Sequence, residues 1–194
     1  MDKKKIILAS QSPRRKWLLE QIGLEFDIIT SNFDENIEGK KFSRQLIESL
    51  AFEKAKDVAA RVGDDALIIA ADTVVILGSK ILGKPKDEAD AKSMLKQLSG
   101  REHKVMTAVA IIDKYEDKIL LKSTLSKVKF KKLSEREIDD YIKTGEPMDK
   151  AGSYGIQAYG SIFVEKVEGC YNNIVGLPLN LLSEMLKCFG VYLI

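Results

Sequence analysis

Basic side chains at the start of a predicted helix are the first candidates for chemistry. Arg14 and Arg15 follow Ser12 and Pro13, two residues that suit a helix start. A helix N-terminus presents unpaired N–H groups and a partial positive charge, so an acidic side chain is normally preferred there. Two guanidinium groups at this position indicate either a phosphate ligand that shares the site or a solvated basic turn.

Lys54 is the second candidate, because it falls inside the apolar arc of a helix predicted over residues 42–62. A cation inside such an arc either extends its ammonium to the surface or meets an anion. Both interpretations stay open from the sequence alone: a snorkelling lysine, or a half-buried lysine directed at a ligand phosphate.

Asp72 follows an almost wholly apolar segment, residues 66–71, which predicts a strand that is buried on both faces and ends at residue 71. Ligands of α/β sheets bind beyond the carboxyl ends of strands. Thr73 and Lys84 complete a carboxylate, hydroxyl and cation group within 13 residues, although Asp at a strand end is also a common turn former. Glu35, in an acidic loop, is a candidate second carboxylate or a merely solvated one.

Residues 151–160 form a glycine-rich segment with glycines at 152, 155 and 160, which allow close backbone approach. Gln157 offers a donor and an acceptor that can recognise the amide-and-carbonyl edge of a nucleobase. The spacing matches neither GxxxxGK[ST] nor GxGxxG, so no Walker or Rossmann phosphate site follows.

The scarcity of histidine and cysteine restricts the chemistry further. Because His103 is the single histidine, a zinc site, a Ser/His/Asp triad or a Cys/His dyad would all depend on it. This histidine opens a strand-like run. Cys170 and Cys188 are far apart and are interpreted as small buried hydrophobes. Catalysis must therefore be built from carboxylates, Lys, Arg, hydroxyls and backbone groups.

The overall composition excludes several classes of protein. The 194 residues carry 31 Lys plus Arg against 29 Asp plus Glu, a net charge of +2, so no bulk field favours nucleic acid or membrane binding. No apolar run approaches the roughly 20 residues needed to span a bilayer. We expect a cytoplasmic protein with no membrane partner.

Alternating helices and strands in the first half, and locally paired strands in the second, predict one α/β unit over residues 1–194 around a mixed sheet. The strands are expected at 5–10, 26–31, 66–71, 74–77, 80–82, 104–114, 118–130 and 161–167. The helices are expected at 13–23, 42–62, 87–98, 134–145 and 178–189.

Several segments carry a family resemblance by their order along the chain: LASQSPRR, FEKA, AADTVV, GKP, LSGREHKVMTAVAI, DKAGSYGIQAYG and NNIVGLPL. Together they resemble the Maf family of nucleoside triphosphate pyrophosphatases, historically named septum-formation inhibitors. The resemblance implies an elongated, two-lobed, inosine-triphosphatase-like α/β fold, with a mixed, twisted central sheet, flanking helices and a cleft. It also implies a divalent cation, Mg²⁺ or Mn²⁺, and hydrolysis between the α and β phosphates to a monophosphate and pyrophosphate.

Within that family the chain resembles the dTTP/UTP branch, through Arg14, Thr73 and Gln157 at the specificity positions. The resemblance makes Asp72 the proton acceptor. The remaining phosphate and metal positions that it implies are Ser10, Arg15, Glu35, Lys54 and Lys84. Of all these residues, Asp72 and Glu35 are expected to be the metal ligands. Ala158 departs from the pattern, which has Gly after the Gln, and its methyl group is expected to narrow the base pocket.

Two other functions are compatible with parts of the sequence. A non-catalytic division regulator that binds nucleic acid or a septum protein would explain the Arg pair, but it gives no reason for Asp72 and Glu35 to line a cationic pocket. A pyrophosphatase of purine or methylated nucleotides is the other alternative, and modified pyrimidine nucleotides are further candidate substrates. The resemblance is also compatible with a homodimer.

Overall fold

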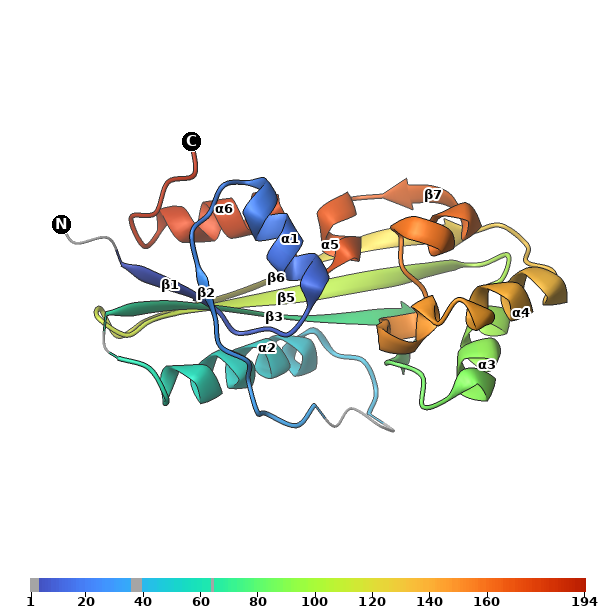
Figure 1. Cartoon of the computed structure of the whole chain (residues 1–194), viewed down its shortest axis with the longest axis horizontal. Helices are drawn as coiled ribbons and strands as arrows, with labels where there is room; N and C mark the ends of the chain where they lie inside the picture. The colour runs from blue at the N-terminus through green and yellow to red at the C-terminus, as the bar shows by residue number, and fades with distance from the viewer. Residues whose placement is uncertain (1–3, 36–39, 64) are drawn as a thin grey trace.

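A computed structural model describes residues 4–35, 40–63 and 65–194 of the chain. Within these residues one seven-stranded sheet has the order β2-β1-β3-β5-β6-β7, and β4 pairs with β3 (Figure 1). β1 is parallel to β2 and β3, and the remaining pairs are antiparallel. The predicted mixed sheet is thereby confirmed, with strands β1 (Lys5–Leu8), β2 (Asp27–Ile28), β3 (Ala66–Leu77), β4 (Lys80–Leu82), β5 (Glu102–Asp113), β6 (Lys118–Phe130) and β7 (Val164–Glu168).

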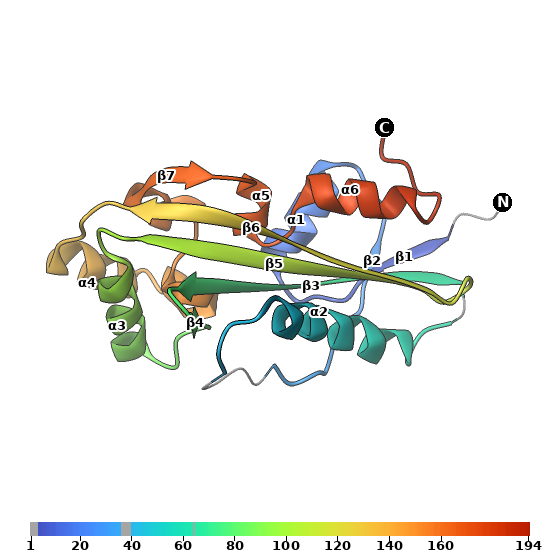
Figure 2. The same ribbon diagram turned by 180° about the vertical axis from the view of Figure 1, so that it is seen from behind.

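Helices cover both faces of this long sheet (Figure 1 and Figure 2). α2 (Arg44–Ala59) lies on one face, and α1 (Pro13–Gln21), α5 (Tyr171–Val175) and α6 (Leu179–Lys187) lie on the other. α3 (Glu88–Leu98) and α4 (Glu135–Lys143) pack together at one end, followed by 3₁₀ segments at Glu146–Asp149, Ala151–Ser153 and Ala158–Phe163. None of the helices within the described residues combines the length and the apolar character that a membrane span requires.

β3 is the central element of the core, because its side chains alternate between two hydrophobic clusters. Ile68 and Ala70 pack on the side of α2, whereas Ile69 and Ala71 pack on the opposite side. Asp72 does not end this strand, contrary to the sequence prediction, since pairing with β5 is unbroken from Leu67 to Ile76. The non-local ladder keeps the backbone extended through two polar residues.

The open edge of β3 determines where a ligand can approach. β1 ends at Leu8, opposite Ile69, and β4 pairs with β3 only from Val75 onward. On this side no described strand pairs with residues 70–74. The site therefore lies beyond the carboxyl end of β1, the parallel neighbour, and Asp72 lies along an open strand edge.

Other predicted features are confirmed or corrected by the structure. The capping box of Ser134 and Glu137 is present. β2 is shorter than expected, β7 begins later because residues 158–163 form a 3₁₀ segment, and α5 was not predicted because five residues show no helical period. The cysteines are not both buried: Cys170 is half-buried and Cys188 is exposed.

Candidate functional site

A cavity of about 1440 Å³ runs along the open edge of β3. All nine candidate residues from the sequence line it, although they come from segments spread over most of the chain: Ser10, Arg14, Arg15, Glu35, Lys54, Asp72, Thr73, Lys84 and Gln157. Their functional roles remain predictions, but the fold gathers them around one space.

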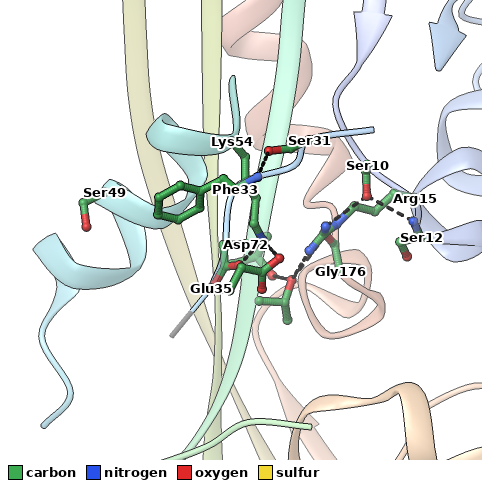
Figure 3. A network of polar contacts seen from close by, with 12 residues as sticks. Ser10, Ser12, Arg15, Ser31, Phe33, Glu35, Ser49, Lys54, Asp72 and Gly176 are labelled. Carbon is green, nitrogen blue, oxygen red and sulfur yellow. Dashed lines mark hydrogen bonds and ion pairs between the residues drawn. The ribbon is translucent and has the colours of Figure 1, made fainter. Parts of the chain in front are cut away.

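Lys54 forms the centre of one half of the site (Figure 3). Its side chain is buried, and Nζ bonds both to Asp72 Oδ1 and, at 2.6 Å, to Glu35 Oε1. The ammonium therefore does not snorkel to the surface. It meets anions, but these anions are carboxylates of the protein, and the ligand phosphate that one interpretation of the sequence placed at Lys54 stays a prediction.

The environment of Glu35 favours its ionised form. Desolvation by burial alone would raise the pKa of this carboxyl, but the charge and hydrogen bond of Lys54, with the charges of Lys84 and Arg15, lower the pKa below its usual range. Lys84 itself is exposed on the turn after β4, where it lines the cavity.

Two carboxylates beside a cationic cavity fit a divalent metal that arrives with its ligand. Among the described residues no group of three or more His, Cys, Asp or Glu side chains is placed to hold a metal. Mg²⁺ commonly binds through one or two carboxylates, waters and substrate phosphates. The donor set of Asp72 and Glu35 therefore suits such shared coordination rather than a closed protein cage.

Arg15 forms the second half of the site and is held on three sides. Nε donates to Gly176 O at 2.8 Å and Nη1 to Ser10 Oγ at 3.2 Å (Figure 3). Nη2 donates to Thr73 Oγ1 at 3.1 Å. Burial lowers the pKa of the guanidinium, and Asp72 and Glu35 oppose that effect. Since a guanidinium has five N–H donors, two remain for a ligand.

A buried network behind Thr73 supports this arginine. The Thr73 hydroxyl lies 2.9 Å from the Thr107 hydroxyl, which donates to Asn173 O at 2.8 Å. The fully buried Asn173 side chain accepts from Thr107 N at 3.0 Å and donates to Val105 O and Ser126 Oγ, both at 2.9 Å. Sequence reasoning missed this support, although Asn173 belongs to the NNIVGLPL segment.

Arg14 faces a different partner from Arg15. Its Nη1 lies 2.9 Å from Asp149 Oδ2, so α1 is joined to the 3₁₀ segment Glu146–Asp149. Burial alone would raise the pKa of Asp149, but hydrogen bonds from Lys150 and Arg14 lower it. No signal in the sequence linked Asp149 to Arg14, because 135 positions separate them.

Gln157 and Ala158 lie in the glycine-rich loop at the cavity wall. Gln157 is half-buried, and within the described residues its side-chain amide has no hydrogen-bond partner. Ala158 has a φ of 51°, a left-handed conformation that favours glycine. Its departure from the expected Gly therefore affects the backbone as well as the width of the pocket.

His103 takes no part in this constellation. It is 2% exposed in β5, its Nε2 lies 2.7 Å from Tyr154 Oη, and its ring packs edge-on against Phe130. Burial lowers its pKa to about 4. The prediction that His103 opens a strand is thus confirmed by β5, and its partner Tyr154 lines the cavity.

The mixed sheet defines an α/β protein. Along the open edge of β3, carboxylates and cations line a cavity that is suited to an anionic ligand. The chain belongs to the Maf-like protein family, which it matches over residues 5–189. It is 53% identical over 182 residues to the dTTP/UTP pyrophosphatase of Clostridioides difficile (strain 630), covering 94% of this chain and 93% of that protein.

Another relative and one solved structure extend the comparison. The dTTP/UTP pyrophosphatase of Acetivibrio thermocellus is 50% identical over 193 residues, covering 96% of each chain. A HAM1 protein from Coxiella burnetii has a TM-score of 0.52 at 17% identity and covers 95% of this chain and 99% of that one. This last likeness concerns the fold alone.

Proposed function

We propose that the protein is a pyrophosphatase that hydrolyses dTTP and UTP to the monophosphate and pyrophosphate. The observation that carries the proposal is the bridge from Lys54 to Asp72 and Glu35 beside the anchored Arg15 in one cavity. The names of the relatives support the same activity and the same two substrates.

The cavity suggests how its own side chains divide the reaction. Arg15, Lys54 and Lys84 bind the phosphate oxygens and offset the charge that develops there. Asp72 accepts a proton from the attacking water, whose oxygen bonds to phosphorus as the anhydride bond between the α and β phosphates breaks. The pyrophosphate then leaves with the electron pair of that bond.

Asp72 and Glu35 would hold the divalent cation, with Mg²⁺ or Mn²⁺ as candidates. When bound, such a cation neutralises phosphate charge and lowers the pKa of coordinated water. Arg14 and Gln157 are proposed to face the nucleobase. Thr73 is already engaged with Arg15 and Thr107, so any effect of Thr73 on specificity would act through the position of Arg15.

A panel of nucleotides tests the proposal directly. Purified protein with Mg²⁺ or Mn²⁺ should release pyrophosphate from dTTP and UTP faster than from CTP, purine or methylated nucleotides. A purine or methylated-nucleotide preference would favour the alternative substrates, and no turnover would favour the division regulator.

The catalytic assignment is tested by Asp72→Asn, which should abolish release while the fold is retained by circular dichroism. Asp139→Asn is a matched control, because Asp139 forms a surface ion pair with Lys92 on α3. Unchanged turnover in Asp72→Asn would contradict the assignment.

A single unit over residues 1–194, a cytoplasmic location and a homodimer remain predictions that accompany this function. A single cooperative unfolding transition would support one unit. Cell fractionation tests the location, and light scattering of the purified protein tests the homodimer.

A further inference from the structure

Glu146 is a half-buried carboxylate at the start of a 3₁₀ segment, and its side chain reaches the glycine-rich loop. Oε1 accepts from Gly160 N at 3.2 Å and from Tyr141 Oη at 3.0 Å. Oε2 accepts from Tyr159 N at 3.0 Å. One carboxylate therefore satisfies two consecutive amides at the end of the loop, and charge-assisted bonds of this kind are stronger than neutral ones.

Tyr141 ties the beginning of the same loop to the same carboxylate. Its hydroxyl accepts from Gly155 N at 3.2 Å while it donates to Glu146. The ring is buried on α4 and packs edge-on against Phe163, with centroids 4.9 Å apart. The tyrosine is thus fixed by packing, and both ends of residues 155–160 converge on one pair of side chains.

Close backbone contact shows how tightly the loop is closed. A Cβ on Gly160 would lie 2.3 Å from Gly155 O and 2.8 Å from Tyr141 Oη. A Cβ on Gly155 would lie 3.3 Å from Glu146 Oε1. Gly160 is therefore needed for the loop to close around this pair, whereas a Cβ on Gly155 would come closest to Lys150 Cε, at 2.9 Å, the end of a flexible side chain that can move.

Gln157 lies in the middle of the closed loop, next to the left-handed Ala158. Its own amide is held by no hydrogen bond to the described residues, so its position depends on the backbone around it. A non-glycine residue at positive φ persists only where its surroundings fix it. The bonds of Glu146 to the next two amides supply that constraint.

We propose that Glu146, with Tyr141, is a positioning residue for nucleobase selection. It acts by fixing the loop that presents Gln157, and this inference rests on the proposed function. Glu146 is not a catalytic residue, because three internal donors already occupy its carboxylate and the phosphate-binding cations Arg15, Lys54 and Lys84 come from other segments.

Glu146→Gln is the direct test, because it keeps the shape and turns one acceptor oxygen into an NH₂ group that opposes Tyr159 N–H. We expect the KM for dTTP and UTP to rise about tenfold, with kcat within about twofold, because a lost charge-assisted hydrogen bond has about that effect. The preference for UTP over CTP should fall by a similar factor. Inhibition by inorganic tripolyphosphate, which lacks a base, should not change.

Two further variants separate positioning from general destabilisation. Tyr141→Phe keeps the ring but removes the hydroxyl, and it should shift KM in the same direction, less than additively with Glu146→Gln. Glu135→Gln, on the exposed side of α4 where Glu135 pairs with Lys96, should leave KM unchanged. Amide exchange at residues 155, 159 and 160 should be faster in Glu146→Gln than in the wild type.

Several outcomes would overturn the inference. An unchanged preference for UTP over CTP in folded Glu146→Gln would overturn it. An equal loss of affinity for nucleotides and for tripolyphosphate would also overturn it, because that result indicates a merely structural role. No turnover by the wild type would overturn the proposed function alone. In that case the affinities of the wild type and of Glu146→Gln for UMP and CMP would decide the role of Glu146. A base preference weakened by the substitution supports the inference, and an unchanged preference refutes it.

Discussion

Acidification should destabilise the protein through its single histidine, beginning at a pH above the range in which carboxyl groups titrate. Burial lowers the pKa of His103 from 6.5 to about 4 in the folded protein. Between these two values the unfolded chain binds a proton that the folded protein does not bind. Stability is therefore fully present above pH 6.5 and is lost as the pH falls toward 4.

The magnitude follows from the size of this pKa difference. One pKa unit corresponds to about 1.4 kcal/mol, so the complete transition lowers the free energy of unfolding by about 3 kcal/mol, and about 2 kcal/mol of this is lost between pH 7.5 and pH 5. Carboxyl groups with lowered pKa values add their own losses only below about pH 4.5, as for Glu137, whose pKa is lowered to about 2.

Urea unfolding at pH 7.5, 6 and 5 measures this effect, with His103→Gln as the comparison. Glutamine does not titrate, so the variant should show a nearly flat free energy of unfolding over this range, whatever its absolute stability. Equal pH slopes in the two proteins, or an NMR titration of His103 near pH 6.5 in the folded state, would refute the reasoning. The ring of His103 faces Tyr154 and, within the described residues, no candidate catalytic residue. Activity should therefore fall only at pH values where the protein begins to unfold.

Three other substitutions test the supports of the site. Ala158→Gly should raise the free energy of unfolding by about 0.5 to 1 kcal/mol in thermal melts, because glycine relieves the left-handed conformation; a loss would contradict this. Asn173→Ala should cost about 2 to 3 kcal/mol in urea unfolding, since it leaves buried partners unpaired, and an unchanged midpoint would refute it. Asp149→Asn should cost under about 1 kcal/mol yet raise the KM for UTP severalfold by freeing Arg14; steady-state kinetics with an unchanged KM would disprove that role.

Local signals in the sequence predicted local features of the structure. Ser134 and Glu137 form their capping box because both residues lie within one helical turn. Lys54 was correctly placed in the apolar arc of its helix, since helical period alone decides which face a residue occupies. These predictions needed no knowledge of distant contacts.

Features that depend on distant contacts could not be predicted in the same way. Asp72 is inside β3 rather than at its end, because the ladder with β5 overrides the turn tendency of Asp and Thr. Asn173 and Asp149 support Thr107 and Arg14 across 66 and 135 positions of sequence. Neither contact leaves a periodic or spacing signal in a single sequence.

The two halves of the site depend on the alternation of side chains along one strand. Asp72 points to the α2 side and meets Lys54, whereas Thr73 points to the other side and meets Arg15. A helix packed on one face could not supply both partners, because consecutive strand residues face opposite sides. Both halves are reached from one cavity only because β1 stops at Leu8 and leaves the edge of β3 open. The near-neutral net charge therefore conceals a local grouping of cations and two carboxylates along the open edge of β3.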